Sequence, residues 1–186
     1  ALAALQAADR LELSINGNVA ALACDEMLRL ASVLSCPVEV NIFYRTPERM
    51  EAILGHINER KTVLGLDVLV LGDAPDARIP GLKGPRAACH REGILESDVI
   101  LVPLEDGDRC NALVTMGKTV IVIDLNPLSR SAQQGTITIV DELSRALNTM
   151  LTVAAEEGNV DLDEAYDHQA VLNDGLAEML SAMNRT

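Results

Sequence analysis

The sequence predicts a Rossmann-like α/β fold, an open and mostly parallel sheet with helices on both faces. Short aliphatic runs alternate with segments whose apolar residues recur at helical spacing, and this alternation is typical of βα units. The runs at 99–102 and 119–123 are continuously aliphatic, as in parallel strands covered on both faces. With 186 residues, the chain fits one α/β domain spanning positions 1–186.

The same alternation assigns the elements in order. Strands are expected at the short apolar runs, namely 11–15, 38–43, 67–71, 99–102, 119–123 and 136–140. Helices are expected between them, at 19–34, 47–60, 106–117 and 141–155, followed by an amphipathic C-terminal helix at about 161–183. Pro47 opens the second helix and Asp141 caps the fourth. Residues 72–93 are rich in Gly and Pro and are expected to be mostly irregular.

Composition excludes several classes of function. The formal net charge is -13, and no basic face could neutralise a phosphate backbone, so neither nucleic acid nor membrane is expected as a partner. No apolar run of about 18 residues exists and no signal peptide is recognisable, so a cytoplasmic protein is expected. The four cysteines stand far apart, which indicates buried thiols rather than a zinc site.

Polar residues follow the predicted strands, where parallel α/β sheets bind their ligands. After the first strand, Asn16 and Asn18 flank a helix N-terminus that could hold an anion; an ordinary Asn-Gly turn capped by Asn18 is the alternative. After the second strand, Arg45 and Arg49 could converge on a phosphate or carboxylate. Alternatively, both arginines pair with surface acids.

Two later segments concentrate charge and hydrogen-bond donors. Asp106 and Asp108 could hold magnesium or orient an amine, and Arg109 could neutralise a transferring group; a solvated helix start is the alternative. Residues 124–131 include Arg130, which suits polyphosphate, but lack the Walker A pattern. No catalytic triad can be proposed.

Four ordered segments are the most distinctive part of the sequence: SINGNVAAL at 14–22, NIFYRT at 41–46, VPLEDGDR at 102–109 and IDLNPLSRSA at 123–132. Together they closely resemble the archaeal 4-phosphopantoate–β-alanine ligases, the phosphopantothenate synthetases of coenzyme A biosynthesis. RIPGL at 78–82 and ITIVD at 137–141 also look like family sequence, so the resemblance covers nearly the whole chain.

The resemblance implies a homodimeric ligase that uses ATP and Mg²⁺ to convert 4-phosphopantoate to an acyl adenylate, from which β-alanine displaces AMP. The residues expected by similarity to line the ATP site are Asp124, Leu125, Asn126, Arg130, Ser131, Glu142 and Leu143. For 4-phosphopantoate we expect Asn16, Asn18 and Arg45, and around the reacting carboxyl Asp106, Asp108 and Arg109. Adenylation depends on positioning and charge stabilisation rather than on a nucleophilic side chain, so it needs no triad.

The chain also departs from the family pattern. Family members usually carry a further N-terminal helical segment with basic residues that reach the nucleotide, whereas this chain begins near its first strand, so incomplete ATP binding and little ligase activity are expected. The run at 67–71 could add a strand or an edge hairpin. Two alternatives stay open: a nucleotide-dependent oxidoreductase, opposed by the missing GxGxxG, and a non-catalytic nucleotide-binding dimerisation module.

Overall fold

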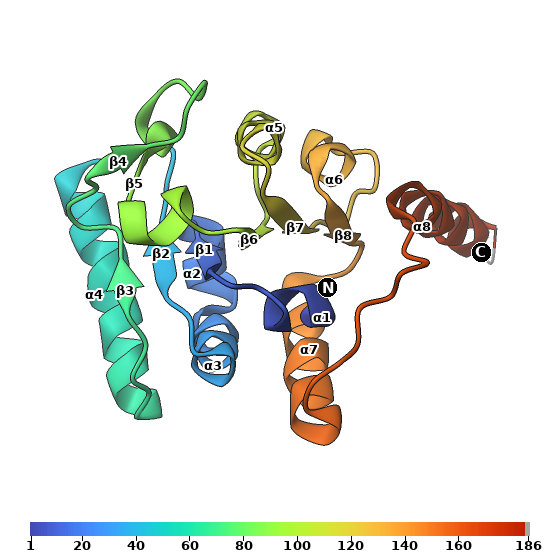
Figure 1. The fold of residues 1–186 in the computed structure, drawn as a ribbon, viewed down its shortest axis with the longest axis horizontal. Helices are drawn as coiled ribbons and strands as arrows, with labels where there is room; N and C mark the ends of the chain where they lie inside the picture. The colour runs from blue at the N-terminus through green and yellow to red at the C-terminus, as the bar shows by residue number, and fades with distance from the viewer. Residues whose placement is uncertain (185–186) are drawn as a thin grey trace.

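A six-stranded parallel sheet forms the centre of the computed structural model, which describes residues 1–184 (Figure 1). The strands are β1 (Leu11–Ile15), β2 (Val38–Val40), β3 (Val70–Leu71), β6 (Val99–Pro103), β7 (Thr119–Ile123) and β8 (Ile137–Ile139), arranged in the order β3-β2-β1-β6-β7-β8. Leu13 of β1 pairs with Val38 on one side and Leu101 on the other. The chain therefore winds outward in both directions from the centre, as in a doubly wound fold, and the predicted fold class is confirmed.

Helices cover both faces of this sheet (Figure 1). One face carries α2 (Gly17–Leu22), α3 (Cys24–Leu34), α4 (Pro47–Leu64) and α7 (Leu143–Glu157). The other carries α5 (Gly107–Thr115), α6 (Arg130–Gln134) and a hairpin of β4 (Ala77–Arg78) and β5 (Ala88–Cys89). Each face of the sheet has its own hydrophobic core. In β6, Leu101 packs on the face covered by α3 and α7 and Ile100 on the face covered by α5, which explains why this strand is aliphatic at successive positions.

Several element boundaries differ from the sequence prediction. The helix expected at 19–34 is two helices, α2 and α3, because Ala23 leaves the helical region with φ -150° and ψ 37°. The cap of α2 is Asn16 rather than Asn18, and the cap of α7 is Glu142 rather than Asp141. In both cases the side chain that accepts hydrogen bonds from the first turn lies one or two residues from the predicted position.

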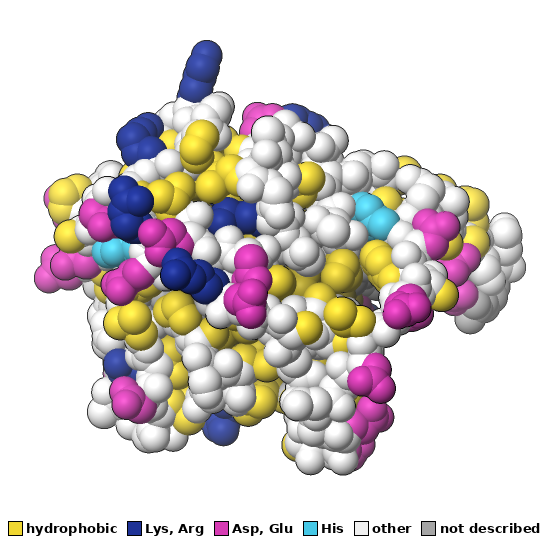
Figure 2. All heavy atoms as spheres, in the orientation of Figure 1, with side chains coloured by type: hydrophobic (Ala, Val, Ile, Leu, Met, Phe, Trp, Pro, Cys, Tyr) yellow, Lys and Arg dark blue, Asp and Glu magenta, His cyan; other side chains and the backbone are white. Residues whose placement is uncertain are grey.

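The C-terminal helix is shorter than predicted. It is α8 (His168–Met183), capped by Asp167, and residues 161–166 are not helical. His168 ties the start of α8 to the sheet, because its Nε2 lies 3.1 Å from the Thr138 hydroxyl of β8 and 2.9 Å from the Ala132 carbonyl oxygen. On the face drawn in Figure 2, the region over α7 and α8 shows acidic side chains and almost no basic ones.

The Gly- and Pro-rich stretch is more ordered than expected. Besides the β4–β5 hairpin it contains a 3₁₀ turn, η1 (Pro85–Ala87), and a π-type turn, η2 (Arg91–Leu95). The run at 67–71 supplies the edge strand β3 beside β2, but only Val70 and Leu71 are strand, so the predicted strand is shorter than expected. The short helix α1 (Leu2–Gln6) was not predicted. All four cysteines are buried free thiols, as expected, and no helix within residues 1–184 is long and apolar enough to cross a bilayer.

Candidate active site at the carboxyl end of the sheet

The predicted polar segments follow neighbouring strands and meet at one edge of the sheet. Asn16 follows β1, Glu105 comes shortly after β6, and Asp124 follows β7. Between β1 and β6 the connections diverge to opposite sides, and such a switch point is where open α/β sheets bind ligands. These candidate residues therefore lie together at the carboxyl end of the sheet.

Asn16 joins the ends of β1 and β6. Its Oδ1 accepts hydrogen bonds from the backbone N–H groups of Asn18 and Val19, at 3.0 and 3.1 Å. Its Nδ2 donates to the carbonyl oxygens of Pro103 and Leu104, both at 3.0 Å. Since both amide hydrogens are engaged and the residue is 8% exposed, Asn16 acts here as a structural cross-link, while Asn18 is exposed.

The two arginines after β2 do not converge. Arg45 donates to the Gly72 and Asp73 carbonyl oxygens, beyond the end of edge strand β3. Arg49 lies elsewhere: a Cβ added to Gly17 would be 3.2 Å from its Nη2, so its guanidinium rests over the start of α2. The alternative interpretation expected both arginines to pair with surface acids, but within residues 1–184 neither forms such an ion pair.

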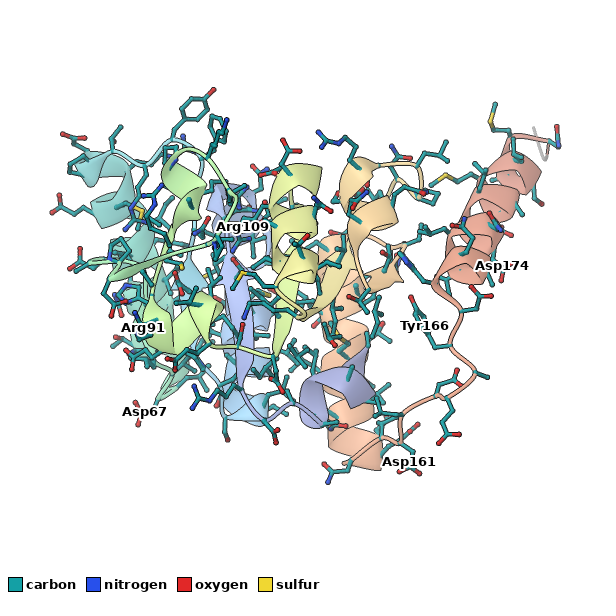
Figure 3. All side chains as sticks on the ribbon, turned by 45° about the horizontal axis from the view of Figure 1, so that its top comes forward. Asp67, Arg91, Arg109, Asp161, Tyr166 and Asp174 are labelled. Carbon is teal, nitrogen blue, oxygen red and sulfur yellow. The ribbon has the colours of Figure 1, made fainter. Side chains whose placement is uncertain are left out.

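A buried ion-pair network lies under this edge. We call its members, Ser14, Asn41, Arg86, Glu105 and Arg109, the buried floor. Glu105 is sandwiched between Arg109, which is fully buried, and Arg86, whose Nη1 and Nη2 reach its carboxylate oxygens at 2.5 and 2.6 Å. Arg109 also donates to the Ser14 hydroxyl at 3.0 Å, and it lies inside the molecule in Figure 3. Paired in this way, two guanidinium groups can stay charged in the interior.

Asp106 is the exposed end of this network. Its Oδ1 caps α5 by accepting from the Arg109 backbone N–H at 2.9 Å, and its Oδ2 accepts from Arg86 Nη1 at 3.1 Å. The side chain is nevertheless 45% exposed. It faces a cleft of 580 Å³ between residues 80–86 and α5, whose lining also includes Phe43, Lys83 and Asp108.

The loop after β7 is built differently, and we call Asp108 together with residues 124–131 the open rim. Asp124 accepts hydrogen bonds from the Ser129 and Ser131 hydroxyls at 2.6 and 2.9 Å, which folds the loop into a compact turn before α6. Arg130 pairs with Asp108 at the surface, where their side chains are 72% and 71% exposed. A Cβ on Gly107 would lie 3.0 Å from the Arg130 backbone carbon, so only glycine lets α5 and α6 approach this closely.

The other predicted nucleotide residues are distributed over this rim and the next helix. Leu125 is 54% exposed, and the Asn126 side chain accepts from the Leu128 backbone N–H at 3.0 Å. Glu142 uses both carboxylate oxygens to cap α7, and Leu143 is buried in the core beside it. Because its side chain is buried, Leu143 could contact a ligand only through its backbone, at the first turn of α7.

A pair of buried acidic residues, Glu12 and Glu39, lies deeper in the molecule and was not predicted from the sequence. Glu12 is fully buried, and burial together with neighbouring Glu39 raises its pKa well above the usual value. A Cβ added to Gly93 would be 3.2 Å from Glu12 Oε2 and would overlap Glu39 Oε2, so the two carboxyl groups meet behind η2. Burial also raises the pKa of Glu39, which accepts from the His90 and Ile94 backbone N–H groups at 2.9 Å.

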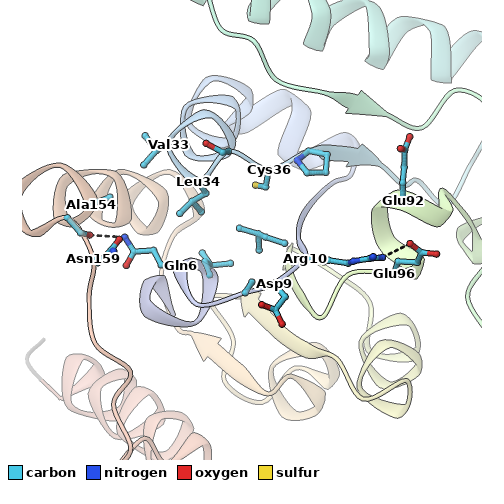
Figure 4. A pocket seen from close by; sticks show the side chains of 16 residues that line it. Gln6, Asp9, Arg10, Val33, Leu34, Cys36, Glu92, Glu96, Ala154 and Asn159 are labelled. Carbon is cyan, nitrogen blue, oxygen red and sulfur yellow. Dashed lines mark hydrogen bonds and ion pairs between the residues drawn. The ribbon is translucent and has the colours of Figure 1, made fainter.

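A cavity of 730 Å³ lies at the opposite, amino end of the strands (Figure 4). Two of its polar side chains are already engaged: Gln6 bonds to the Gly158 carbonyl oxygen and the Val160 N–H, and Arg10 pairs with Glu96. Larger volume alone does not make this the active site, because ligands of parallel sheets bind at the carboxyl ends.

Comparison with known proteins gives the family. The profile of the phosphopantothenate/pantothenate synthetase family matches residues 1–182. The chain belongs to this family. It is 42% identical to the 4-phosphopantoate–β-alanine ligase of Thermococcus onnurineus (strain NA1), over 100% of this chain and 72% of that protein. The ligase of the same name from Methanosarcina mazei is 44% identical, over 96% of this chain and 71% of that protein.

A third relative of the synthetase family, the 4-phosphopantoate–β-alanine ligase of Thermococcus kodakarensis, is 42% identical over 93% of this chain and 67% of its own length. Among solved structures, a universal stress protein in complex with cAMP aligns at 17% identity and a TM-score of 0.36, covering 73% of this chain and 97% of that one. At that TM-score the alignment bears on neither fold nor function.

Proposed function

We propose that this protein is an ATP-dependent ligase that joins 4-phosphopantoate to β-alanine, forming 4'-phosphopantothenate for coenzyme A biosynthesis. The observation that carries the proposal is the 42–44% identity, along nearly the whole chain, to proteins named as this ligase. The site adds physical support, because its polar side chains gather at the edge of the sheet where nucleotides bind in doubly wound folds.

The open rim is the proposed ATP site. Arg130 is its exposed cation, and it can exchange the Asp108 carboxylate for a phosphate with little structural change, because both partners are at the surface. The serine-rich turn held by Asp124 and the start of α7 at Leu143 supply further groups around the nucleotide. These roles are the predicted ones, assigned by family similarity.

Magnesium fits this rim as a companion of the nucleotide. Within residues 1–184, no group of three or more His, Cys, Asp or Glu side chains could hold a metal ion. Mg²⁺ commonly takes one or two carboxylates and completes its shell with phosphate oxygens and water. Asp108 is the exposed carboxylate suited to this, and bound Mg²⁺ would offset the charge of the phosphates.

Asp106 is placed for the second half of the reaction. The carboxylate of 4-phosphopantoate displaces pyrophosphate from ATP to give the acyl adenylate, and the β-alanine nitrogen then attacks the acyl carbon and releases AMP. The amine must lose a proton as it attacks, and a half-exposed carboxylate facing the cleft can hold the ammonium group and accept that proton. Arg109, fully buried under this site, supports Asp106 rather than touching a substrate.

The structure changes which residues we propose for binding 4-phosphopantoate. Asn16 is committed to the backbone, and Arg45 to the β3 end, so Asn18 and Arg49 at the start of α2 are the better candidates for its phosphate or carboxylate. A homodimer, expected from the family resemblance, and a cytoplasmic setting, expected from the sequence, stay part of the proposal.

The test is product analysis. The protein is incubated with Mg²⁺, ATP, 4-phosphopantoate and β-alanine, and the adenine nucleotides are separated by chromatography. AMP and pyrophosphate should form in equal amounts only when both acid and amine are present. ADP and phosphate would contradict the adenylate route, and product formation that does not depend on β-alanine would contradict the function.

A further inference from the structure

We propose that Arg86 is a positioning residue for the amine-transfer step and that it acts through Asp106. This inference rests on the proposed ligase function. Arg86 belongs to η1, in the Gly- and Pro-rich stretch that the sequence marks as an irregular excursion, yet it reaches the centre of the site.

Each of the three nitrogens of the Arg86 guanidinium has at least one hydrogen-bond acceptor within the protein. Nε donates to Asn41 Oδ1 at 3.2 Å. Nη1 serves Glu105 Oε1 at 2.5 Å and Asp106 Oδ2 at 3.1 Å. Nη2 serves the Asn41 carbonyl oxygen at 3.2 Å and Glu105 Oε2 at 2.6 Å. Arg86 borders the cleft, but four hydrogen bonds and the ion pair to Glu105 already hold its guanidinium. We therefore infer that its effect on catalysis passes through the groups it holds rather than through direct binding of a substrate anion.

The contacts are reciprocal, which makes the arrangement stiff. Asn41 Nδ2 donates to the Arg86 and Ala88 carbonyl oxygens at 3.2 and 3.0 Å, so the end of β2 is tied to η1 from both sides. The Arg86 side chain is 10% exposed and that of Glu105 1%. Bidentate, desolvated pairs of this kind fix orientation as well as contributing attraction.

Among its carboxylate partners only Asp106 reaches the cleft. Asp106 has one oxygen held by the α5 cap and the other by Arg86, and it remains 45% exposed. A carboxylate accepts about four hydrogen bonds, so Asp106 keeps capacity for an ammonium group. Arg86 thereby fixes the orientation of the Asp106 carboxylate towards the bound ammonium group. A displacement of about 1 Å is enough to lower a rate about hundredfold.

The experiment separates the two half-reactions. Pyrophosphate exchange into ATP, dependent on 4-phosphopantoate, reports adenylation without amine; 4'-phosphopantothenate formation reports the complete reaction. Arg86→Ala should lower the complete reaction about hundredfold while leaving exchange within about threefold of wild type. Guanidinium ion should restore part of the lost rate, and urea at the same concentration should not. Arg78→Ala, an exposed arginine on the preceding strand β4, is the matched control and should change neither rate.

A double-mutant cycle with Asp106→Asn tests the route of the effect. If Arg86 acts through Asp106, Arg86→Ala should lower the complete reaction no further in the Asp106→Asn background. Arg86→Lys keeps the positive charge but loses the two-pronged guanidinium group, so its rate for the complete reaction should lie between those of wild type and Arg86→Ala. Equal loss of both half-reactions, absence of guanidinium rescue, or additive effects in the cycle would each overturn the proposal. Failure of wild-type exchange would instead count against the adenylate mechanism and so against the proposed function.

Discussion

The buried floor and the open rim carry similar residue types but hold them in opposite states. On the floor, Glu105 and the arginines beside it are at most one-tenth exposed and bond to each other. On the rim, Arg130 and Asp108 form an equally direct pair that is more than 70% exposed. A charged side chain is available to a ligand only when burial and neighbouring partners have not already committed it. We therefore expect the buried floor to act mainly in structure and the open rim to bind the ligand.

The largest stability effect should come from the floor. Arg109→Met leaves Glu105 with one guanidinium instead of two in the interior, and breaking a buried pair in this way costs about 3–5 kcal/mol. Urea unfolding measures the loss. The control is Arg10→Met, which removes a surface pair whose arginine is 64% exposed and should cost about 1 kcal/mol or less. Similar losses from the two variants would erase the distinction between floor and surface.

Asn16→Ala should have the next largest effect. The change removes the α2 cap, worth about 0.5–2 kcal/mol. It also removes the hydrogen bonds from the Asn16 side chain to the carbonyl oxygens of Pro103 and Leu104. Ser129→Ala on the rim removes only the cap of the short helix α6 and should cost about 1 kcal/mol. If Asn16 were instead a substrate ligand, its loss would raise the KM for 4-phosphopantoate without lowering the free energy of unfolding.

The deeper acid pair predicts a pH dependence. Because burial raises the pKa of Glu12 well above 4.5, the folded chain keeps a proton that the unfolded chain releases. Stability is therefore lost as pH rises above about 4.5, by about 1.4 kcal/mol per pH unit while folded Glu12 stays protonated. Glu12→Gln should remove this slope, so its stability relative to wild type should rise with pH. Parallel pH profiles of the two proteins in chemical denaturation would contradict the assignment.

Much of the fold was readable from the sequence, because the aliphatic runs at Leu11–Ile15 and Thr119–Ile123 are strands with the predicted bounds. The clustering of polar residues at the carboxyl end of the sheet was predictable for the same reason, since polar residues follow those runs. What could not be read is which polar groups are already satisfied. Arg86 and Asn41 are 45 positions apart, and their mutual hydrogen bonds depend on the path of residues 72–93, where no periodic pattern exists.

Two predicted helix caps were wrong, because the sequence does not show which of two neighbouring polar side chains is already engaged elsewhere. Asn16 and Asn18 are chemically equivalent candidates for a cap, as are Asp141 and Glu142. The Asn16 side chain also bonds to the end of β6, which is a tertiary contact, whereas Asp141 is engaged locally by Arg145, four residues along the chain. The roles expected for Arg45 and Arg109 were inferred from their charge, and the structure shows that both side chains are already engaged by protein groups.

The most direct test of the account is Arg130→Ala, measured for ATP affinity by calorimetry and for stability by urea unfolding. Arg130 lies on the open rim with its side chain 72% exposed, so its loss should change the free energy of unfolding by about 1 kcal/mol or less. A charge-assisted hydrogen bond to phosphate is worth about 1.5–3 kcal/mol, so ATP affinity should fall about tenfold to hundredfold. Unchanged ATP affinity, or a loss of stability as large as that of Arg109→Met, would contradict the division between a structural floor and a nucleotide-binding rim.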